Sequence, residues 1–187
     1  IFSLFLILSL GISHGALDHI KGKKLLKILN YKSTLIFYIL YILISLSVIL
    51  LWVLFPKILL LAFLFVASFH FGKEDSEFIN YKQKNEVIYF FKGSLVITAP
   101  LLFHKEETLK IFNNLNFDIS QSLFISNEFL ILFIVISLFT NILLSLSKQI
   151  DVKSLLVMDF ASILLLNYFL NPILAFTFYF CFLHSIR

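Results

Sequence analysis

An uninterrupted apolar run at residues 34–54 limits the possible folds more than any other feature of this chain. The run contains no charged side chain, and about 20 such residues are what a helix needs to cross the roughly 30 Å hydrocarbon core of a bilayer. Further apolar segments occupy residues 1–20, 58–72, 87–103, 123–146, 154–170 and 173–187. Because lipid offers no partner to backbone N–H and C=O groups, each segment is expected to be a helix. The sequence therefore predicts an all-α, polytopic transmembrane helical bundle with about seven spanning helices.

Composition supports a membrane protein and excludes other classes. Of the 187 residues, 60% are hydrophobic and 14% are charged, whereas soluble domains carry roughly 25% charged residues. A single cysteine, Cys181, excludes an intramolecular disulfide and a cysteine-based metal cluster. The chain has no evident linker or internal repeat, and it begins with Ile1 rather than Met. We therefore expect one integral-membrane domain over residues 1–187, truncated at both ends.

Lysines are distributed unevenly among the connections between the apolar segments. The odd-numbered connections carry most of them: Lys21, Lys23, Lys24, Lys27 and Lys32 in the first, Lys73, Lys82 and Lys84 in the third, and Lys148 and Lys153 in the fifth. By the positive-inside rule these connections face the cytoplasm of a multi-pass cell-membrane protein. The net charge of +4 is thus explained by membrane orientation, and we expect no nucleic-acid partner.

Three histidines are expected at one depth in this bundle. His70 lies 14 residues beyond Pro56, and His184 lies 12 residues beyond Pro172, which corresponds to about 21 and 18 Å of helix. His14 comes shortly before the first lysine cluster, so all three are placed in the cytoplasmic leaflet. Imidazoles that face the interior of a helical bundle suit iron, zinc or copper. The sequence therefore predicts a metal site in that leaflet.

Acidic side chains lie close to these histidines. Asp18 is four positions after His14 and so lies on the same helical face, where it is expected to orient the imidazole, although pairing with a nearby lysine stays open. Asp75 follows His70 and is either a partner of the site or a solvated loop acid. Asp159 should reach the same leaflet from the sixth apolar segment. We expect Asp18, Asp75 and Asp159 to support the metal ligands.

Other polar residues are given lesser roles. His19 lies roughly 140° from the preceding histidine around a helix, which makes it a neighbour of the site or an interfacial residue. His104 ends a helix of the opposite direction and should lie at the other membrane face. Lys92 is expected to snorkel to the cytoplasmic surface, and Glu128 to lie at the interface. Gly72 permits close approach of another helix or marks a helix end.

Four short motifs can be considered together: "GISHGALDH" at residues 11–19, "SFHFGKED" at 68–75, "APLLFH" at 99–104 and "FYFCFLHSIR" at 178–187. Their order and spacing resemble the Brp/Blh family of membrane β-carotene 15,15′-dioxygenases over nearly the whole chain. The resemblance implies a catalytic domain that uses Fe(2+) and O2 to cleave β-carotene, taken up from the lipid bilayer, into two molecules of retinal. A rhodopsin is the natural recipient of that retinal.

The resemblance also implies a set of site residues. His14, His70 and His184 would be the catalytic iron ligands. The family's last motif continues with a further histidine directly after the position of Arg187, where this sequence stops. The fragment by itself is therefore expected to bind iron weakly or not at all, and the activity is expected of the full-length protein.

Two other functions stay open from the sequence. A proton-coupled membrane transporter would use His14, Asp18, His70 and Asp159 as a relay, because ionisable groups inside a membrane commonly mark proton pathways. The broken helices and inverted repeats that favour a transporter are not evident in the sequence. A membrane di-iron desaturase or hydroxylase would need more histidines than the five present.

Overall fold

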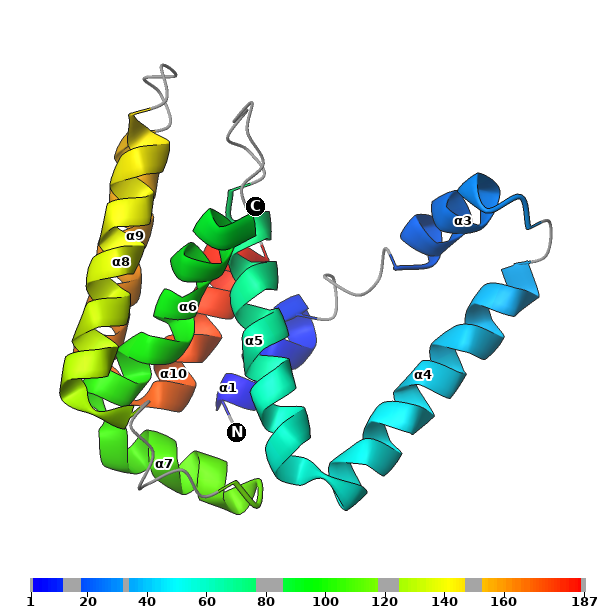
Figure 1. Ribbon diagram of the computed structural model, residues 1–187, viewed down its shortest axis with the longest axis horizontal. Helices are drawn as coiled ribbons and strands as arrows, with labels where there is room; N and C mark the ends of the chain where they lie inside the picture. Colours follow the sequence, from blue (N-terminus) through cyan, green and yellow to red (C-terminus); the bar gives the residue numbers. More distant parts are fainter. Residues whose placement is uncertain are drawn as a thin grey trace.

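The computed structural model describes residues 2–11, 18–31, 34–76, 86–117, 125–146 and 153–185, and these residues form helices and turns without a strand (Figure 1). In chain order the elements are α1 (Phe2–Leu6), η1 (Ile7–Gly11), α3 (Asp18–Ile28), α4 (Thr34–Leu54), α5 (Pro56–Glu74), α6 (Glu86–Phe103), α7 (Lys105–Asn114), α8 (Asn127–Ser145), α9 (Lys153–Phe169), α10 (Pro172–Phe178) and η4 (Tyr179–His184). The segments η1 and η4 are π-helices. The all-α prediction is confirmed for the described part of the chain.

Four of the described helices, α4, α5, α6 and α8, are long and apolar enough to cross a membrane. The apolar helices at Ser154–Phe169 and Pro172–His184 are shorter. The predicted first span is divided into α1, η1 and the lysine-bearing α3, with residues 12–17 outside the described part. The structure thus supports a membrane protein, but it does not confirm the predicted count of about seven spans.

Prolines and polar caps fix where several helices begin. Pro56 and Pro172 occupy the first turns of α5 and α10, where a fixed φ is favourable and a missing N–H costs nothing. Asn171 caps α10 by accepting a hydrogen bond from the Leu174 N–H at 3.0 Å. Ser126 caps α8 in the same way through the Phe129 N–H at 3.2 Å. The start signals of α5 and α10 set the register of the two helical segments that lead to His70 and His184.

Helices α5 and α6 touch at the level of their backbones. A Cβ atom on Gly72 would clash with the carbonyl oxygen of Tyr89, and one on Gly93 would clash with that of Ser68. Small residues at a crossing allow this close approach, and they are common where membrane helices pack. The predicted role of Gly72 in close approach is confirmed. As a result the C-terminal end of α5 is held against the N-terminal half of α6.

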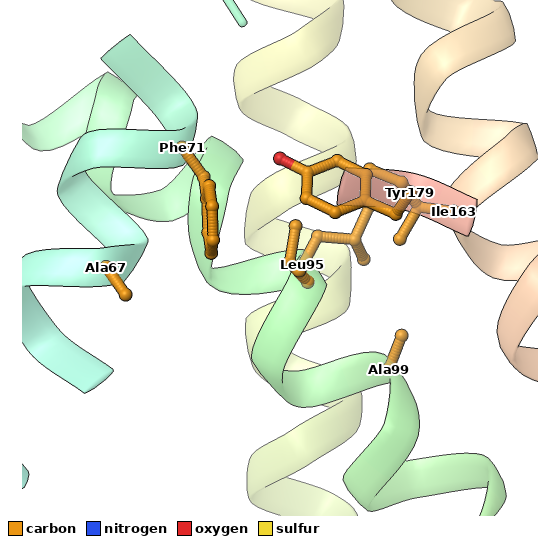
Figure 2. Packing of buried hydrophobic residues seen from close by; sticks show 7 residues of the cluster. Ala67, Phe71, Leu95, Ala99, Ile163 and Tyr179 are labelled. Carbon is orange, nitrogen blue, oxygen red and sulfur yellow. The ribbon is translucent and has the colours of Figure 1, made fainter. Parts of the chain in front are cut away.

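The core of the bundle lies where α5, α6, α9 and η4 meet. Figure 2 shows Ala67 and Phe71 of α5 beside Leu95 and Ala99 of α6, with Tyr179 and Ile163 completing the cluster. By contrast, α4 extends away from the bundle (Figure 1) and has no buried residue. Amphipathic α7 crosses the end of the bundle opposite to the C-terminal end of α5 (Figure 1). The two ends of the bundle therefore differ, and the candidate site lies at the end away from α7.

Candidate metal centre

Three side chains from two elements meet at the C-terminal end of α5. The Nε2 atom of His70 lies 3.8 Å from Oε2 of Glu74, and Nε2 of His184 lies 3.6 Å from the same oxygen. One ligand atom from each residue falls within 4.8 Å of the other two. The three residues therefore form a candidate metal centre of two imidazoles and one carboxylate.

Local helix geometry explains how these groups converge. His70 and Glu74 are four positions apart on α5, so their side chains lie on one face. His184 ends η4, in which the Ser185 N–H donates to the carbonyl of Phe180 at 2.9 Å, five residues back. Such π-helical turns are rare and are often found at functional sites. The π register places His184 against the face of α5 that carries the other two ligand atoms.

A hydrogen-bond chain fixes the orientation of His184. Its Nδ1 lies 2.8 Å from Oδ1 of Asp75, and the hydroxyl of Tyr179 donates to Oδ2 of the same carboxylate at 2.7 Å. An ionised carboxylate only accepts hydrogen bonds, so Nδ1 is the nitrogen that donates in this contact. A neutral imidazole in this arrangement has its lone pair on Nε2, which lies 3.6 Å from Oε2 of Glu74. A carboxylate behind a histidine is the usual support of a metal ligand.

Aromatic rings enclose the same imidazole. The ring of Phe71 meets His184 edge to face with centroids 5.0 Å apart, and the ring of Phe180 stacks on it at 5.8 Å. The His184 side chain is 0% exposed, whereas that of His70 is 45% exposed. The protein thus holds His184 rigidly and leaves the His70 imidazole accessible within the described part of the chain.

Lys92 is a correction to the sequence-based interpretation. Instead of snorkelling to the surface, it is buried, and its Nζ donates to the backbone carbonyl of Asp75 at 2.6 Å and to the hydroxyl of Ser76 at 3.1 Å. Both acceptors lie just beyond the last turn of α5, where helix carbonyls lack partners within the helix. Lys92 therefore ties α6 to the segment that carries Asp75.

The structure brings together some of the predicted site residues but not all. His70 and His184 lie in the cluster, and Asp75 contacts His184 directly, so Asp75 is not a solvated loop acid. Asp159 is buried on α9 and is not one of the three clustered residues. His14 lies outside the described residues.

The remaining polar residues lie away from the cluster or are not fully described. Asp18 is the first residue of α3, but its side chain is outside the described part of the chain. His19 is exposed on α3, and Glu128 is exposed in the first turn of α8. His104 lies at the C-terminal end of α6, next to α7.

Sequence reasoning missed Glu74 as a site residue. It stands one helical turn after His70 within the motif "SFHFGKED", and a histidine and a carboxylate at this spacing on one helix can share a metal ion. The signal was available, but Glu74 resembled the charged residues that commonly end a membrane helix. Its position became informative only when His184 was placed beside it.

The donor set fits the metal that the sequence predicts. Two imidazoles and a carboxylate on one side of an ion are the ligand arrangement of many non-heme iron(II) oxygenases, which keep open positions for other ligands. Neutral imidazole nitrogens and a carboxylate oxygen can also bind zinc. The geometry therefore supports a candidate divalent-metal site with histidine and carboxylate ligands.

Comparison with known proteins gives independent information. The family model described as Beta-carotene 15,15'-dioxygenase matches residues 5–187. A protein named Beta-carotene 15,15'-dioxygenase, from Uncultured marine bacterium 66A03, is 27% identical over 187 residues, which cover 99% of this chain and 66% of the relative. No solved structure matches the chain. Because the family model spans nearly all of the sequence, this chain belongs to the Beta-carotene 15,15'-dioxygenase family.

Proposed function

We propose that the full-length protein cleaves β-carotene at its central 15,15′ double bond with O2, giving two molecules of retinal at an iron(II) centre. The convergence of His70, Glu74 and His184 at the end of α5 is the observation that carries this proposal. Membership of the family supports the substrate and the reaction. The chain spans 66% of the relative's length, so the proposal concerns the longer protein.

The proposed ligands come from both sequence and structure. His70, His184 and Glu74 would hold the iron, and Asp75 would orient His184 through Nδ1. His14 is proposed as a further ligand, with Asp18 as its partner. This assignment is supported by η1, which ends three residues before His14 and packs against η4. Asp159 is proposed to act more remotely, from the neighbouring helix α9.

Bound iron(II) would supply the redox chemistry that allows O2 to react with a closed-shell hydrocarbon. Both oxygen atoms of O2 end in the two aldehyde groups, so the overall reaction requires no net proton transfer. The residues around the centre are suited to a reaction without net proton transfer, because Phe71 and Phe180 offer apolar surfaces beside the imidazole of His184. Such surfaces exclude water and limit side reactions of the products.

The membrane setting follows from the apolar helices. Four described helices are long enough to span a bilayer, and the substrate is a hydrocarbon that dissolves in lipid. With the lysine-rich connections in the cytoplasm, the metal centre would lie in the cytoplasmic leaflet of the cell membrane. Retinal would leave into the same lipid, where a rhodopsin is the proposed recipient.

The test expresses the full-length protein in cells that make β-carotene. The wild type should bleach the cells and yield retinal by chromatography, and His70→Ala should abolish both retinal formation and stoichiometric iron. His104→Ala is the matched control, since His104 lies at the opposite end of α6, and it should retain both. Unchanged carotenoid in cells that contain well-inserted wild-type protein would refute the proposed function.

A further inference from the structure

A cavity of about 240 Å³ lies among η1, α5, α6, α7 and α10. Ala67 and Phe71 of α5 line its end nearest the metal centre, and Ile111 and Phe112 of α7 line the other end. Phe71 is shared between the two features, because its ring also meets the imidazole of His184. The cavity therefore adjoins the aromatic ring that packs against His184.

The hydroxyl protons of the two threonines that line the cavity are already donated within the protein. The Thr108 hydroxyl donates to the carbonyls of Pro100 and His104 at 3.1 and 2.8 Å. The Thr177 hydroxyl donates to the carbonyl of Ile173 at 2.7 Å. All the other lining side chains are aliphatic or aromatic. A hydrogen-bond acceptor on a buried ligand would lose its bonds to water and find no side-chain donor in this lining, so the cavity suits a pure hydrocarbon.

The cavity is elongated and has a floor. Its lining on α5 extends from Phe63 to Phe71, eight residues that correspond to about 12 Å of helix. Helix α7 crosses the end of the bundle away from the metal centre (Figure 1), and Thr108, Ile111 and Phe112 of this helix line the cavity there as its floor. Phe63 and Ile173 line the cavity and are more than half exposed. In a membrane these residues would face lipid, which gives a hydrocarbon a lateral route between α5 and α10.

We propose that this cavity binds one arm of a linear conjugated hydrocarbon and that the floor formed by α7 determines which double bond lies at the metal centre. The inference rests on the proposed function and adds where the substrate lies. The floor limits how far the arm can enter. The distance from Ile111 to the His70–Glu74–His184 cluster therefore determines the length of the arm that fits between them. A symmetric substrate cut at its centre has two equal arms, and one fixed depth suffices to select that bond.

The test changes the floor at Ile111, which lines the cavity from α7. Ile111→Phe should make the cavity shallower. Ile111→Ala should deepen the cavity, and it adds no atoms that could clash with neighbouring side chains. Ile131→Phe is the matched control, because Ile131 is half-exposed on α8 and does not line the cavity. Three quantities are measured on the full-length protein: β-carotene binding from the shift of its visible absorption, the chain length of the aldehydes formed, and the iron content.

Ile111→Phe should weaken β-carotene binding and lower kcat/KM for retinal formation by about tenfold or more, since small steric changes in apolar pockets discriminate to this extent. Ile111→Ala should form unequal aldehydes in addition to retinal. Iron content should stay at the wild-type level in both variants. Wild-type binding and only retinal from both Ile111 variants, or equal losses in Ile131→Phe, would overturn the proposal. If the wild type binds β-carotene without cleaving it, the proposed function fails while the binding comparison still tests the cavity.

Discussion

Asp75→Asn is the most informative single substitution in this protein. The Asp75 carboxylate accepts from Nδ1 of His184 at 2.8 Å and from the Tyr179 hydroxyl at 2.7 Å. Asparagine has nearly the same shape, but it carries no charge and presents one amide nitrogen in place of an oxygen. That nitrogen only donates hydrogen bonds. The asparagine side chain therefore has one accepting oxygen and cannot accept from both His184 and Tyr179 as the carboxylate does. The substitution therefore disturbs the orientation of His184 while preserving the volume of the site.

The expected magnitude follows from the role of a carboxylate behind a metal-bound histidine. Loss of such a partner typically costs 10- to 100-fold in metal affinity, which corresponds to about 1.4–2.7 kcal/mol of binding free energy. We expect the upper half of this range, because His184 is fully enclosed and Asp75 is itself buried.

The assay is an anaerobic competition titration of iron(II) against a chelator of known affinity, with the full-length protein in detergent. Asp159→Asn is the control, because Asp159 is equally buried but lies on α9 outside the ligand cluster. Asp75→Asn should bind iron about 30- to 100-fold more weakly, and Asp159→Asn should lose clearly less affinity, because Asp159 is not one of the three clustered residues. Unchanged affinity in Asp75→Asn would mean that the carboxylate does not orient His184. Equal losses in the two variants would show that the effect comes from removing any buried charge.

Three further substitutions test separate parts of the structure. Glu74→Gln should weaken iron binding by about tenfold or more by the same titration, because a neutral amide replaces a charged ligand, while Glu128→Gln on α8 should leave it unchanged. Tyr179→Phe should weaken iron binding in the same titration less than loss of the carboxylate does, because it removes one hydrogen bond to Asp75 and keeps the charge and the contact with His184. Gly72→Ala should destabilise the protein by about 1–3 kcal/mol, because the added methyl group clashes with the backbone of α6. Its thermal unfolding temperature in detergent should therefore fall, and an unchanged value would contradict the backbone contact.

Local and periodic features of the fold were predictable from the sequence. The apolar runs gave the helices, and the starts of α5 and α10 at Pro56 and Pro172 allowed the depths of His70 and His184 to be counted along the helix. Counting residues gives the depth of a side chain along the helix axis, but it does not give the side chain's direction around that axis. The meeting of these two histidines therefore depended on packing, and their role as iron ligands stays a prediction.

Contacts between distant segments could not be predicted in this way. The hydrogen bond from Tyr179 to Asp75 joins residues 104 positions apart, and no periodicity in one segment reports its partner in another. Lys92 was misjudged for a related reason. A lysine near a helix end usually reaches water, and only the tertiary structure shows the carbonyl of Asp75 within its reach. The predicted count of about seven spans is not confirmed: four of the described helices are long and apolar enough to span a membrane, and two further apolar helices are shorter.

The π-helical turn η4 has a consequence for how this protein tolerates changes in length. An α-helix rotates by about 100° per residue, and η4 accommodates one residue more per hydrogen-bonded turn than α10 does. Deleting one residue from 179–183 would therefore restore a continuous α-helix and leave His184 in nearly its present direction, because the turn already absorbs one extra residue. Inserting one residue into α10 as α-helix would instead rotate His184 by about 100° away from α5, with every ligand still encoded. The centre thus tolerates a change of length within 179–183 better than a change of length ahead of it.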